Sequence, residues 1–289
     1  MRCRSLALVG LALLAAAAWA APASPAVQTI VYPRSETFVD PRDDYPVELL
    51  ALALRKADKA VELKPNPIFM LQVRQIVELE QGNSLDVIWT MTSIEREKTL
   101  LPVRVPIDRG LLGWRLLLVR SQSLPRFAGL STAQQLKPLR AGQGFDWPDT
   151  AILRSAGFEV DESVRYSDIF LKLSGGRIDY FPRSVQEIWG ELAAHSGSAF
   201  AVEPSLALHY PAAMYFFVNR QNTALAADIQ LGLERALADG SFEALFQRHF
   251  GAALKRAELD KRRVLELGNP LLPPETPLGN RKLWYQPTR

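Results

Sequence analysis

The feature that most constrains the fold is a repeated alternation of short apolar segments with amphipathic ones. Segments typical of β-strands lie at residues 27–32, 61–64 and 85–89, and they are separated by stretches whose apolar residues recur at helical spacing. Strands separated by helices pair in parallel, because a right-handed crossover through a helix is how they become neighbours in one sheet. The first part of the chain is therefore predicted to be an α/β unit.

A second alternation follows between residues 113 and 212. Strands are expected at residues 116–119, 158–160 and 178–181, with one helix that opens at Pro148 and another over residues 168–173. A strand at residues 213–218 then returns to the first unit, and helices at residues 225–238 and 242–250 follow it. The two units predict a clam-shaped α/β molecule with an inserted second lobe, and the cleft between the lobes is the default ligand site.

These units give a predicted division of the chain. Lobe 1 comprises residues 27–112 together with 213–267, and lobe 2 comprises residues 113–212, with two crossover strands between them. The Pro-rich residues 268–289 form a C-terminal extension, which we expect to lie extended on the surface.

The amino terminus has the pattern of a secretory signal peptide at residues 1–20. Arg2 and Arg4 precede an apolar run that ends in Ala18-Trp19-Ala20, a small-x-small cleavage site. The run is shorter than the roughly 20 apolar residues that cross a bilayer. Cys3 precedes the run, so it is not placed to carry a lipid. We therefore expect a soluble periplasmic protein that is not a lipoprotein.

Composition argues against several classes of function. Cys3 is the only cysteine, so the mature chain is predicted to lack disulfides, thiolate metal sites and cysteine nucleophiles. The net charge of +3, from 34 basic and 31 acidic residues, is too small to indicate a nucleic-acid surface. The 3 histidines form no metal-binding motif, and no glycine-rich phosphate loop lies in the required setting. We expect no nucleic acid, metal or cofactor.

The most informative stretch ends at Arg96. A strand leads directly into Thr92-x-x-Glu95, the pattern of a capping box, so Thr92 is expected to begin a helix with Arg96 in its first turn. A guanidinium beside the free amide groups of a helix start is a strong clamp for a carboxylate or phosphate. The alternative is that Arg96 pairs with an acid on the surface, and spacing alone supports the two interpretations about equally.

From Thr29 to about Gly251, the chain resembles the bacterial periplasmic solute-binding proteins of the polar amino acid type, the family 3 extracellular solute-binding domain. In that family a strand ending in Asp-x-x-x-Gly-x-Thr precedes an arginine that grips the ligand carboxylate, and Arg96 matches this arginine. The segment from Asp228 to the Phe250-Gly251 pair is similar to the closing helices of the family. The resemblance implies a two-lobed, type II periplasmic-binding-protein-like fold, in which each lobe is a mostly parallel sheet flanked by helices.

The sequence departs from the family pattern in both predicted lobes. Trp89 stands where the family has glycine, and the threonine position falls on Met91, with Thr92 one residue later. Trp89 and Thr92 are both candidate ligand-binding residues. In lobe 2, Ser184 replaces the aspartate that holds the ligand amino group in the family, and Ser184 is a further candidate.

Arg183 precedes Ser184-x-x-Glu187, a second capping-box pattern, and is expected to flank another helix start. An arginine near the place of an amine-binding acid reverses the charge of the site, so Arg183 opposite Arg96 would favour an anionic ligand. The alternative is that Arg183 pairs with Glu187 or Glu191 outside the cleft. We favour the cleft, and with it a small, polar, anionic, amino-acid-like ligand.

Two loops complete the candidate site. The loop that begins at Gly142 matches a family loop that gives backbone donors to a carboxylate; Gly144 permits close approach, and Phe145 and Asp146 are expected to line the cleft. In the same loop, Trp147 either lines the cleft or packs as a hydrophobic staple. Near the amino terminus, Tyr32 either offers an aromatic surface to the ligand or belongs to the core at the end of a strand.

The resemblance implies an exported receptor that traps a small-molecule ligand by lobe closure and presents it to an inner-membrane ABC-type importer, acting as a monomer. Two alternatives stay open. One is a sensory module that signals to a membrane protein through the C-terminal extension, although that extension fits a buttress for lobe 1 equally well. The other is a small lyase-type enzyme on the same fold, whose acid or base would be Asp146 or Glu36.

Overall fold

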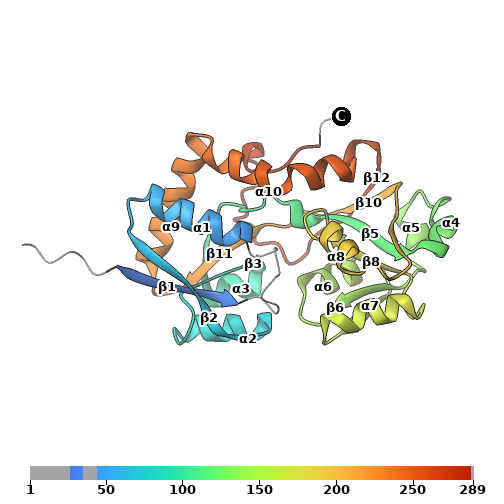
Figure 1. Cartoon of the computed structure of the whole chain (residues 1–289), viewed down its shortest axis with the longest axis horizontal. Helices are drawn as coiled ribbons and strands as arrows, with labels where there is room; N and C mark the ends of the chain where they lie inside the picture. Colours follow the sequence, from blue (N-terminus) through green and yellow to red (C-terminus); the bar gives the residue numbers. More distant parts are fainter. Residues whose placement is uncertain (1–26, 35–43, 288–289) are drawn as a thin grey trace, which may run out of the picture.

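A computed structural model describes residues 27–34 and 44–287, so the predicted signal peptide and Glu36 lie outside the described residues. The molecule consists of two α/β lobes that lie side by side (Figure 1). Within the described part of the chain, no helix combines the length and the apolar character that spanning a membrane requires.

The first lobe contains two small sheets. β1 (Gln28–Arg34) pairs in parallel with β2 (Val61–Phe69). β11 (Met214–Asn219) lies between β3 (Val87–Met91) and β4 (Leu100–Val103) and is antiparallel to both. The helices of this lobe are α1 (Asp44–Lys56), α2 (Gln72–Glu80), α3 (Ile94–Thr99) and α9 (Thr223–Ala238).

The second lobe is one sheet in the order β12-β10-β5-β8-β6-β7, with β9 paired to β5. Its strands are β5 (Trp114–Arg120), β6 (Ala141–Gly144), β7 (Val160–Ser163), β8 (Tyr180–Ser184), β9 (Phe200–Val202), β10 (Leu206–His209) and β12 (Arg263–Glu266). Its helices are α4 (Leu124–Phe127), α5 (Ala133–Leu136), α6 (Pro148–Ser155), α7 (Tyr166–Ser174) and α8 (Ile188–Ala194). β5 is central because its apolar run from Leu116 to Val119 is completely buried.

The sheets differ from the prediction in two respects. The strand–helix units are parallel, as in β6 with β7 and β8, but β5 and β11 pair antiparallel with their neighbours. Both strands follow a crossing between the lobes rather than a helical crossover, so the rule that makes successive strands parallel does not apply to them. In addition, β12, which was predicted within lobe 1, pairs with β10 in the sheet of lobe 2. The other lobe boundaries stay a prediction.

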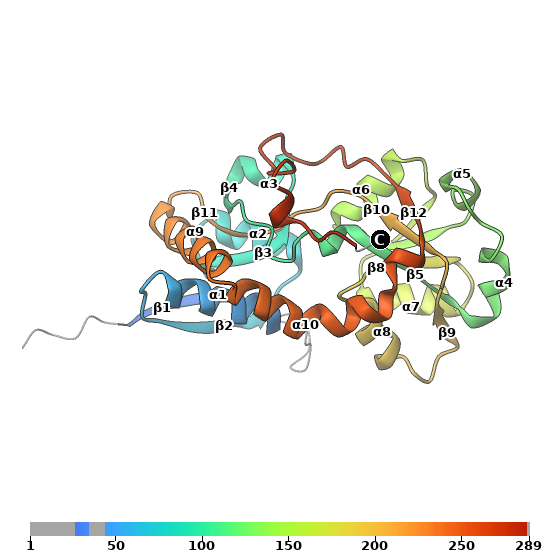
Figure 2. The same cartoon turned by 90° about the horizontal axis from the view of Figure 1, so that it is seen from above.

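α10 (Ser241–Ala257) runs along one side of the molecule from the first lobe to the second (Figure 2). In the first lobe, Phe250 packs edge-on against Tyr45 of α1. In the second, the indole N–H of Trp189 on α8 donates to the carbonyl of Ala253 at 3.2 Å, and the guanidinium of Arg256 lies 4.2 Å from the centre of the Trp189 ring. α10 therefore packs against both lobes.

The chain then returns to the first lobe through residues 268–287, which we name the C-terminal strap. The side-chain amide of Asn269 donates to the carbonyl of Pro211 at 2.8 Å, and the backbone N–H of Tyr285 donates to the carbonyl of Arg109 at 2.7 Å. Next to it, the ring of Trp284 covers Gly110. The contacts of Trp284 and Tyr285 support the interpretation of the C-terminal extension as a buttress for lobe 1.

Gly232 marks the point where α9 crosses α1. A Cβ added at Gly232 would lie 1.8 Å from the carbonyl oxygen of Ala53, so the two helix backbones touch there. We expect Gly232→Ala to lower the free energy of unfolding by roughly 1–3 kcal/mol, because the steric overlap outweighs the gain in helix propensity. Urea denaturation measures this change.

The control is Gly190→Ala in α8, where an added Cβ meets nothing within 4 Å. This variant should be as stable as the parent or more stable by up to about 1 kcal/mol. If both variants changed the free energy of unfolding alike, close approach of α9 to α1 would not explain Gly232.

Candidate functional site

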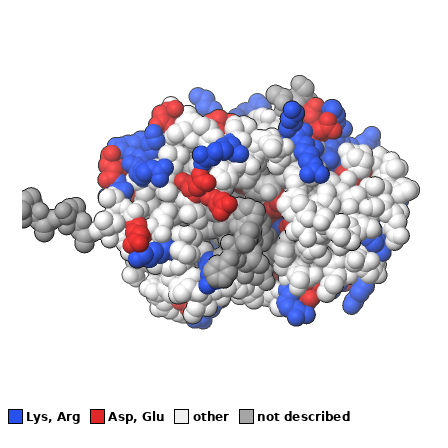
Figure 3. All heavy atoms as spheres, viewed as in Figure 1, with Lys and Arg blue, Asp and Glu red and all other residues white. Residues whose placement is uncertain are grey.

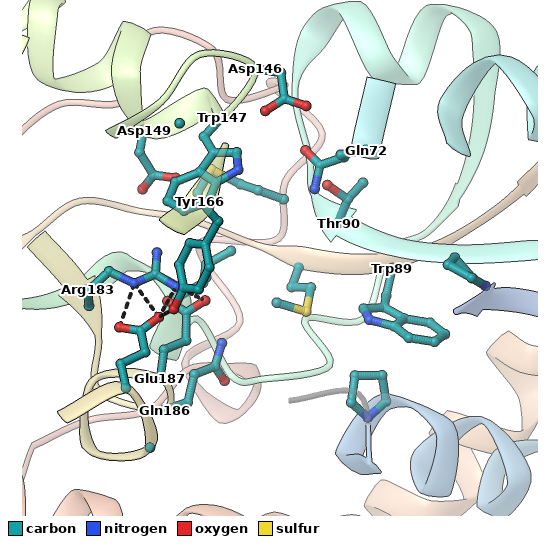
Figure 4. A pocket seen from close by; sticks show the side chains of 18 of the residues that line it. Gln72, Trp89, Thr90, Asp146, Trp147, Asp149, Tyr166, Arg183, Gln186 and Glu187 are labelled. Atoms are coloured by element: carbon teal, nitrogen blue, oxygen red, sulfur yellow. Dashed lines mark hydrogen bonds and ion pairs between the residues drawn. The ribbon is translucent and has the colours of Figure 1, made fainter. Parts of the chain in front are cut away.

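A cleft with a volume of about 980 Å³ lies between the lobes. The first lobe lines it with Gln72 at the start of α2 and with Trp89 and Thr90 in β3. From the second lobe, Asp146 and Trp147 of the β6–α6 loop face these residues, with other residues of that lobe further along the wall (Figure 4). On the face shown in Figure 3, basic and acidic side chains are interspersed on both lobes. Because both signs of charge occur on each lobe, the kind of ligand that the cleft favours depends on how the charged side chains inside it are paired.

Arg183, at the end of β8, lies in the second-lobe wall and has only 2% of its surface exposed. One of its terminal nitrogens, Nη2, lies 2.6 Å from a carboxylate oxygen of Glu191 and 2.9 Å from one of Glu187. The rings of Trp147 and Phe181 pack against the guanidinium, with their centres 4.9 Å and 4.8 Å away. Burial alone would lower the pKa of Arg183, but the two carboxylates outweigh it and hold the pKa well above its usual value.

A second buried arginine, Arg115 in β5, extends this network. Its guanidinium is 1% exposed and lies 2.5 Å from Asp149 and 3.5 Å from Glu187. The hydroxyl of Tyr210 also donates to Asp149. Arg115 and Arg183 therefore share Glu187, and each has a further carboxylate of its own, so three carboxylates offset the two positive charges in this wall before any ligand arrives.

These contacts correct two expectations about the second lobe. Arg183 does line the cleft, but it is paired with Glu187 and Glu191, so it does not present a free positive charge opposite Arg96. Ser184 does not begin a helix: it ends β8, and α8 starts only after Glu187. The Ser184 hydroxyl donates to the carbonyl of Leu111, and Ser184 is not among the described residues that line the cleft.

Arg96 lies in α3, but the start of this helix differs from the prediction by one residue. Ser93, not Thr92, caps α3, and its hydroxyl accepts from the Arg96 N–H. Thr92 is buried and donates instead to Glu97. The Thr92-x-x-Glu95 pattern was misleading because Ser93 also has a hydroxyl, and the backbone turns into the helix only after it.

The guanidinium of Arg96 binds three oxygens of its own lobe. Nη1 donates to the Thr90 hydroxyl at 2.6 Å and to the Met91 carbonyl at 2.7 Å, and Nη2 donates to the Gln72 side-chain carbonyl at 2.5 Å. All three acceptors are neutral. Burial lowers the pKa of Arg96 to about 10, although Asp146 and Asp149 across the lobe boundary act to raise it.

Arg96 lines a second cavity of about 780 Å³, which adjoins the first along the lobe boundary. Asp146, Trp147 and Pro148 border both cavities, and Leu271 of the C-terminal strap closes part of the second. The acceptors of Arg96, by contrast, line the main cleft through Gln72, Thr90 and Met91. The guanidinium therefore lies just behind the lobe 1 wall of the cleft.

The structure places the other candidate residues as follows. Trp89 and Gly144 line the main cleft, and Phe145 lines the second cavity. Trp147, for which two interpretations were open, lines both cavities and also covers Gly144. Tyr32 packs 5.9 Å from Trp89, measured between ring centres, and is not among the described residues that line either cavity.

Sequence reasoning missed Gln72, Thr90, Arg115 and Asp149. Gln72 and Thr90 are neutral side chains without a motif of their own, and only the fold brings them to Arg96. Asp149 follows Pro148 in the first turn of α6, where an acid is favoured by the helix dipole alone. Because the helix dipole alone explains an acid at this position, the sequence did not indicate that Asp149 forms an ion pair with Arg115. Among the described residues, no group of three or more His, Cys, Asp or Glu side chains is arranged to hold a metal ion.

Comparison with known proteins gives matches in structure only. No family model matches the sequence, and no curated protein matches it. Similar structures include a periplasmic binding protein of Salmonella typhimurium with high arginine specificity, at TM-score 0.58 and 15% identity, covering 78% of this chain and 100% of the other. The probable amino-acid ABC transporter extracellular-binding protein YtmK of Bacillus subtilis is similar at TM-score 0.59 and 21% identity, covering 78% and 98%.

The ligand-binding core of GluR0 from Nostoc punctiforme, in complex with L-glutamate, is similar at TM-score 0.55 and 14% identity, covering 77% of this chain and 99% of the other. Further similar structures are arginine-binding proteins and a substrate-binding protein of an amino acid ABC transporter. At these identities the likeness establishes the architecture. The chain has the two-lobed α/β fold of the type II periplasmic binding proteins, as the family resemblance implied.

Asp108 is a buried acid at the lobe boundary, 1% exposed, and it precedes β5. Its carboxylate accepts from the backbone N–H groups of Gly110 at 3.0 Å and Leu112 at 2.7 Å. Burial raises its pKa to about 6, although these hydrogen bonds and Arg115 act to lower it. Because the unfolded chain ionises at about pH 4, the folded state keeps this proton over a range in which the unfolded state loses it.

The free energy of unfolding should therefore fall as the pH rises from about 4 to about 6, and then stay level as far as Asp108 is concerned. Asp108→Asn removes this titration. We expect the stability of the variant relative to the parent to rise by roughly 2–3 kcal/mol across that interval, whatever constant cost the lost acceptor adds. Urea denaturation between pH 4 and pH 8 gives the difference, and a difference independent of pH would refute the assignment.

Proposed function

We propose that this protein is an exported solute-binding protein that captures a small amino-acid-like ligand between its lobes, with Arg96 as the anchor for the ligand carboxylate. The observation that carries the proposal is the set of partners of Arg96: all three are neutral oxygens. The two buried arginines of the second-lobe wall, Arg115 and Arg183, have carboxylates within 3.5 Å.

A partly buried guanidinium without an adjacent anion is a favourable place for a carboxylate. The hydrogen bonds to Gln72 and Thr90 satisfy and orient it, but they do not balance its charge. A carboxylate that displaced the Gln72 carbonyl would gain a charge-assisted hydrogen bond to a partly buried guanidinium. Similar structures that bind arginine, glutamine or glutamate support an amino acid as the ligand class.

The expected preference for a wholly anionic ligand has lost its main support. It depended on a second free positive charge at Arg183, and Glu187 and Glu191 neutralise that charge. What supports the present proposal is a single positive anchor, which requires one acidic group on the ligand. A ligand that contacts both lobes would stabilise the closed state by its additional contacts there, with the crossing segments as the hinge.

Location and partner follow from the same proposal. The signal peptide pattern at residues 1–20 supports a periplasmic protein, and the fold supports delivery of the ligand to an inner-membrane ABC importer by a monomer. Catalysis has less support, because no described residue hydrogen-bonds to Asp146 to orient it as an acid or base.

The test is a thermal-shift screen of the mature protein against individual amino acids, dicarboxylates and phosphorylated metabolites, repeated on Arg96→Gln. A ligand present at 100 times its Kd stabilises the folded state by about 2.7 kcal/mol, which is a shift of several degrees in Tm. The variant should lose between about half and most of the shift at the same ligand concentration, because removing a charge-assisted contact weakens binding roughly 10- to 100-fold.

Arg74→Gln is the matched control, since Arg74 is on α2 close to Gln72 but points outward to Glu78, with 61% of its side chain exposed. It should respond to ligands like the parent. Equal shifts in the parent and in Arg96→Gln would remove Arg96 from the site, and turnover of a bound compound would favour an enzyme.

A further inference from the structure

Two segments of the chain join the lobes and form the hinge. They are residues 104–113, between β4 and β5, and residues 210–213, between β10 and β11. Rotation of one lobe against the other is absorbed by changes of the backbone dihedral angles in such segments. The C-terminal strap follows the part of the chain that resembles the solute-binding family, which ends near Gly251, so the resemblance assigns it no role.

The strap first meets the hinge at residues 210–213. The side-chain amide of Asn269 donates to the carbonyl of Pro211 at 2.8 Å. Two residues later, the carbonyl of Leu271 accepts from the backbone N–H of Ile94, at the start of α3 in the first lobe, at 2.9 Å. The strap is therefore bound to a crossing segment and to a helix of lobe 1 within one short stretch.

The side chain of Leu271 adds an apolar contact at the same place. It packs against a buried cluster whose members come from both lobes and from both crossing segments: Met91 of β3, Ile152 of α6, Leu112, Tyr210 and Ala212. A rotation of the lobes would move these members relative to one another, so the packing of Leu271 depends on the angle between the lobes.

The end of the strap lies on the other crossing segment. Arg109 and Gly110 both have positive φ angles there, 53° and 76°. This conformation is unfavourable for Arg109, which has a Cβ, and it persists only where the surroundings hold it. The Lys282 carbonyl accepts from the Arg109 guanidinium at 3.0 Å, and the Tyr285 N–H donates to the Arg109 carbonyl at 2.7 Å. The ring of Trp284 covers Gly110. Part of the support for this kink therefore comes from the strap.

The strap also ties the two lobes to each other. At its start it is continuous with β12, which pairs with β10 in the second-lobe sheet. Near its end, Trp284 packs against a buried apolar cluster of the first lobe that includes Leu85, Ile88 and Phe217. Between these two points the chain passes over the lobe boundary (Figure 2). A change in the angle between the lobes would therefore have to break contacts of the strap.

We infer that the C-terminal strap is a brace for the hinge, which narrows the range of orientations that the two lobes adopt. A hinge of two segments alone leaves the lobes free to rotate. A third segment bound to both crossing segments restricts this rotation, whatever ligand the cleft takes. The binding free energy needed to change the lobe orientation then includes the strap contacts that are lost. The strap thus acts on the cleft from outside it.

The test removes the end of the strap and measures the distance between the lobes directly. A chain that ends at Gly279, an exposed residue, keeps the early contacts of the strap but lacks those on Arg109 and Gly110. Spin labels are attached at Glu80→Cys on α2 and Leu171→Cys on α7, two exposed positions on opposite lobes. The mature protein offers no competing thiol, because the only cysteine of the sequence precedes the predicted cleavage site.

Pulsed electron paramagnetic resonance without added ligand should give a distance distribution at least about twice as broad for the shortened chain as for the parent. The matched control is a chain that ends at Gln286, which keeps Trp284 and Tyr285 and should give the width of the parent. Trp284→Leu is a second variant, which removes the ring from Gly110 but keeps an apolar side chain on the first lobe, and it should also broaden the distribution.

Circular dichroism checks that each labelled chain is folded, and Trp284→Leu decides the question if the shortened chain is not. Equal widths in the parent and in the folded variants would refute the brace. Because no ligand is added, that result would leave the proposed function standing, and a ligand screen without a hit would leave the brace standing.

Discussion

The behaviour of the cleft depends on where each arginine of its walls finds a counter-charge. In the second lobe, Arg115 and Arg183 share Glu187 and have Asp149 and Glu191 in addition, so five ionised side chains and a tyrosine hold one another in place within a buried wall. Breaking such a network would leave a buried charge uncompensated, which keeps the wall rigid. In the first lobe, Arg96 is held by neutral oxygens and keeps an unbalanced charge. The charges of the second-lobe wall are therefore paired with one another, whereas Arg96 of the first lobe has only neutral hydrogen-bond partners.

Aromatic rings give the paired wall its shape. Trp147 lies over Gly144 and against Arg183, and its ring stacks on Phe181 at an interplanar angle of 18°. The same loop carries Asp146 on the neighbouring position, so the packing of Trp147 fixes the place from which Asp146 faces the first lobe. A half-buried carboxylate is costly unless hydrogen-bond donors or a cation compensate for the lost water.

Periodicity predicted most of the fold, because the strand–helix units and the two closing helices are local patterns. It did not predict β12 in the second sheet or the antiparallel pairing of β5 and β11, since both depend on segments distant in sequence. In the site, the family resemblance located Arg96, Trp89, Gly144 and Asp146 near the lobe boundary, while Thr92 and Ser184 turned to internal partners. Arg183 illustrates the limit: its sequence neighbours Glu187 and Glu191 were recognised as partners, but only the burial of β8 shows that this pairing occurs in the cleft wall itself.

The path of the C-terminal strap has a consequence for how the molecule is made. β12 completes an edge of the second-lobe sheet, and Trp284 and Tyr285 cover the first lobe beside Gly110 and Arg109. During synthesis from the amino terminus, both lobes consequently stay incomplete until these late residues have left the ribosome. Contacts between such distant segments also tie the lobes into one cooperative unit, so that the loss of either lobe exposes apolar surface in the other.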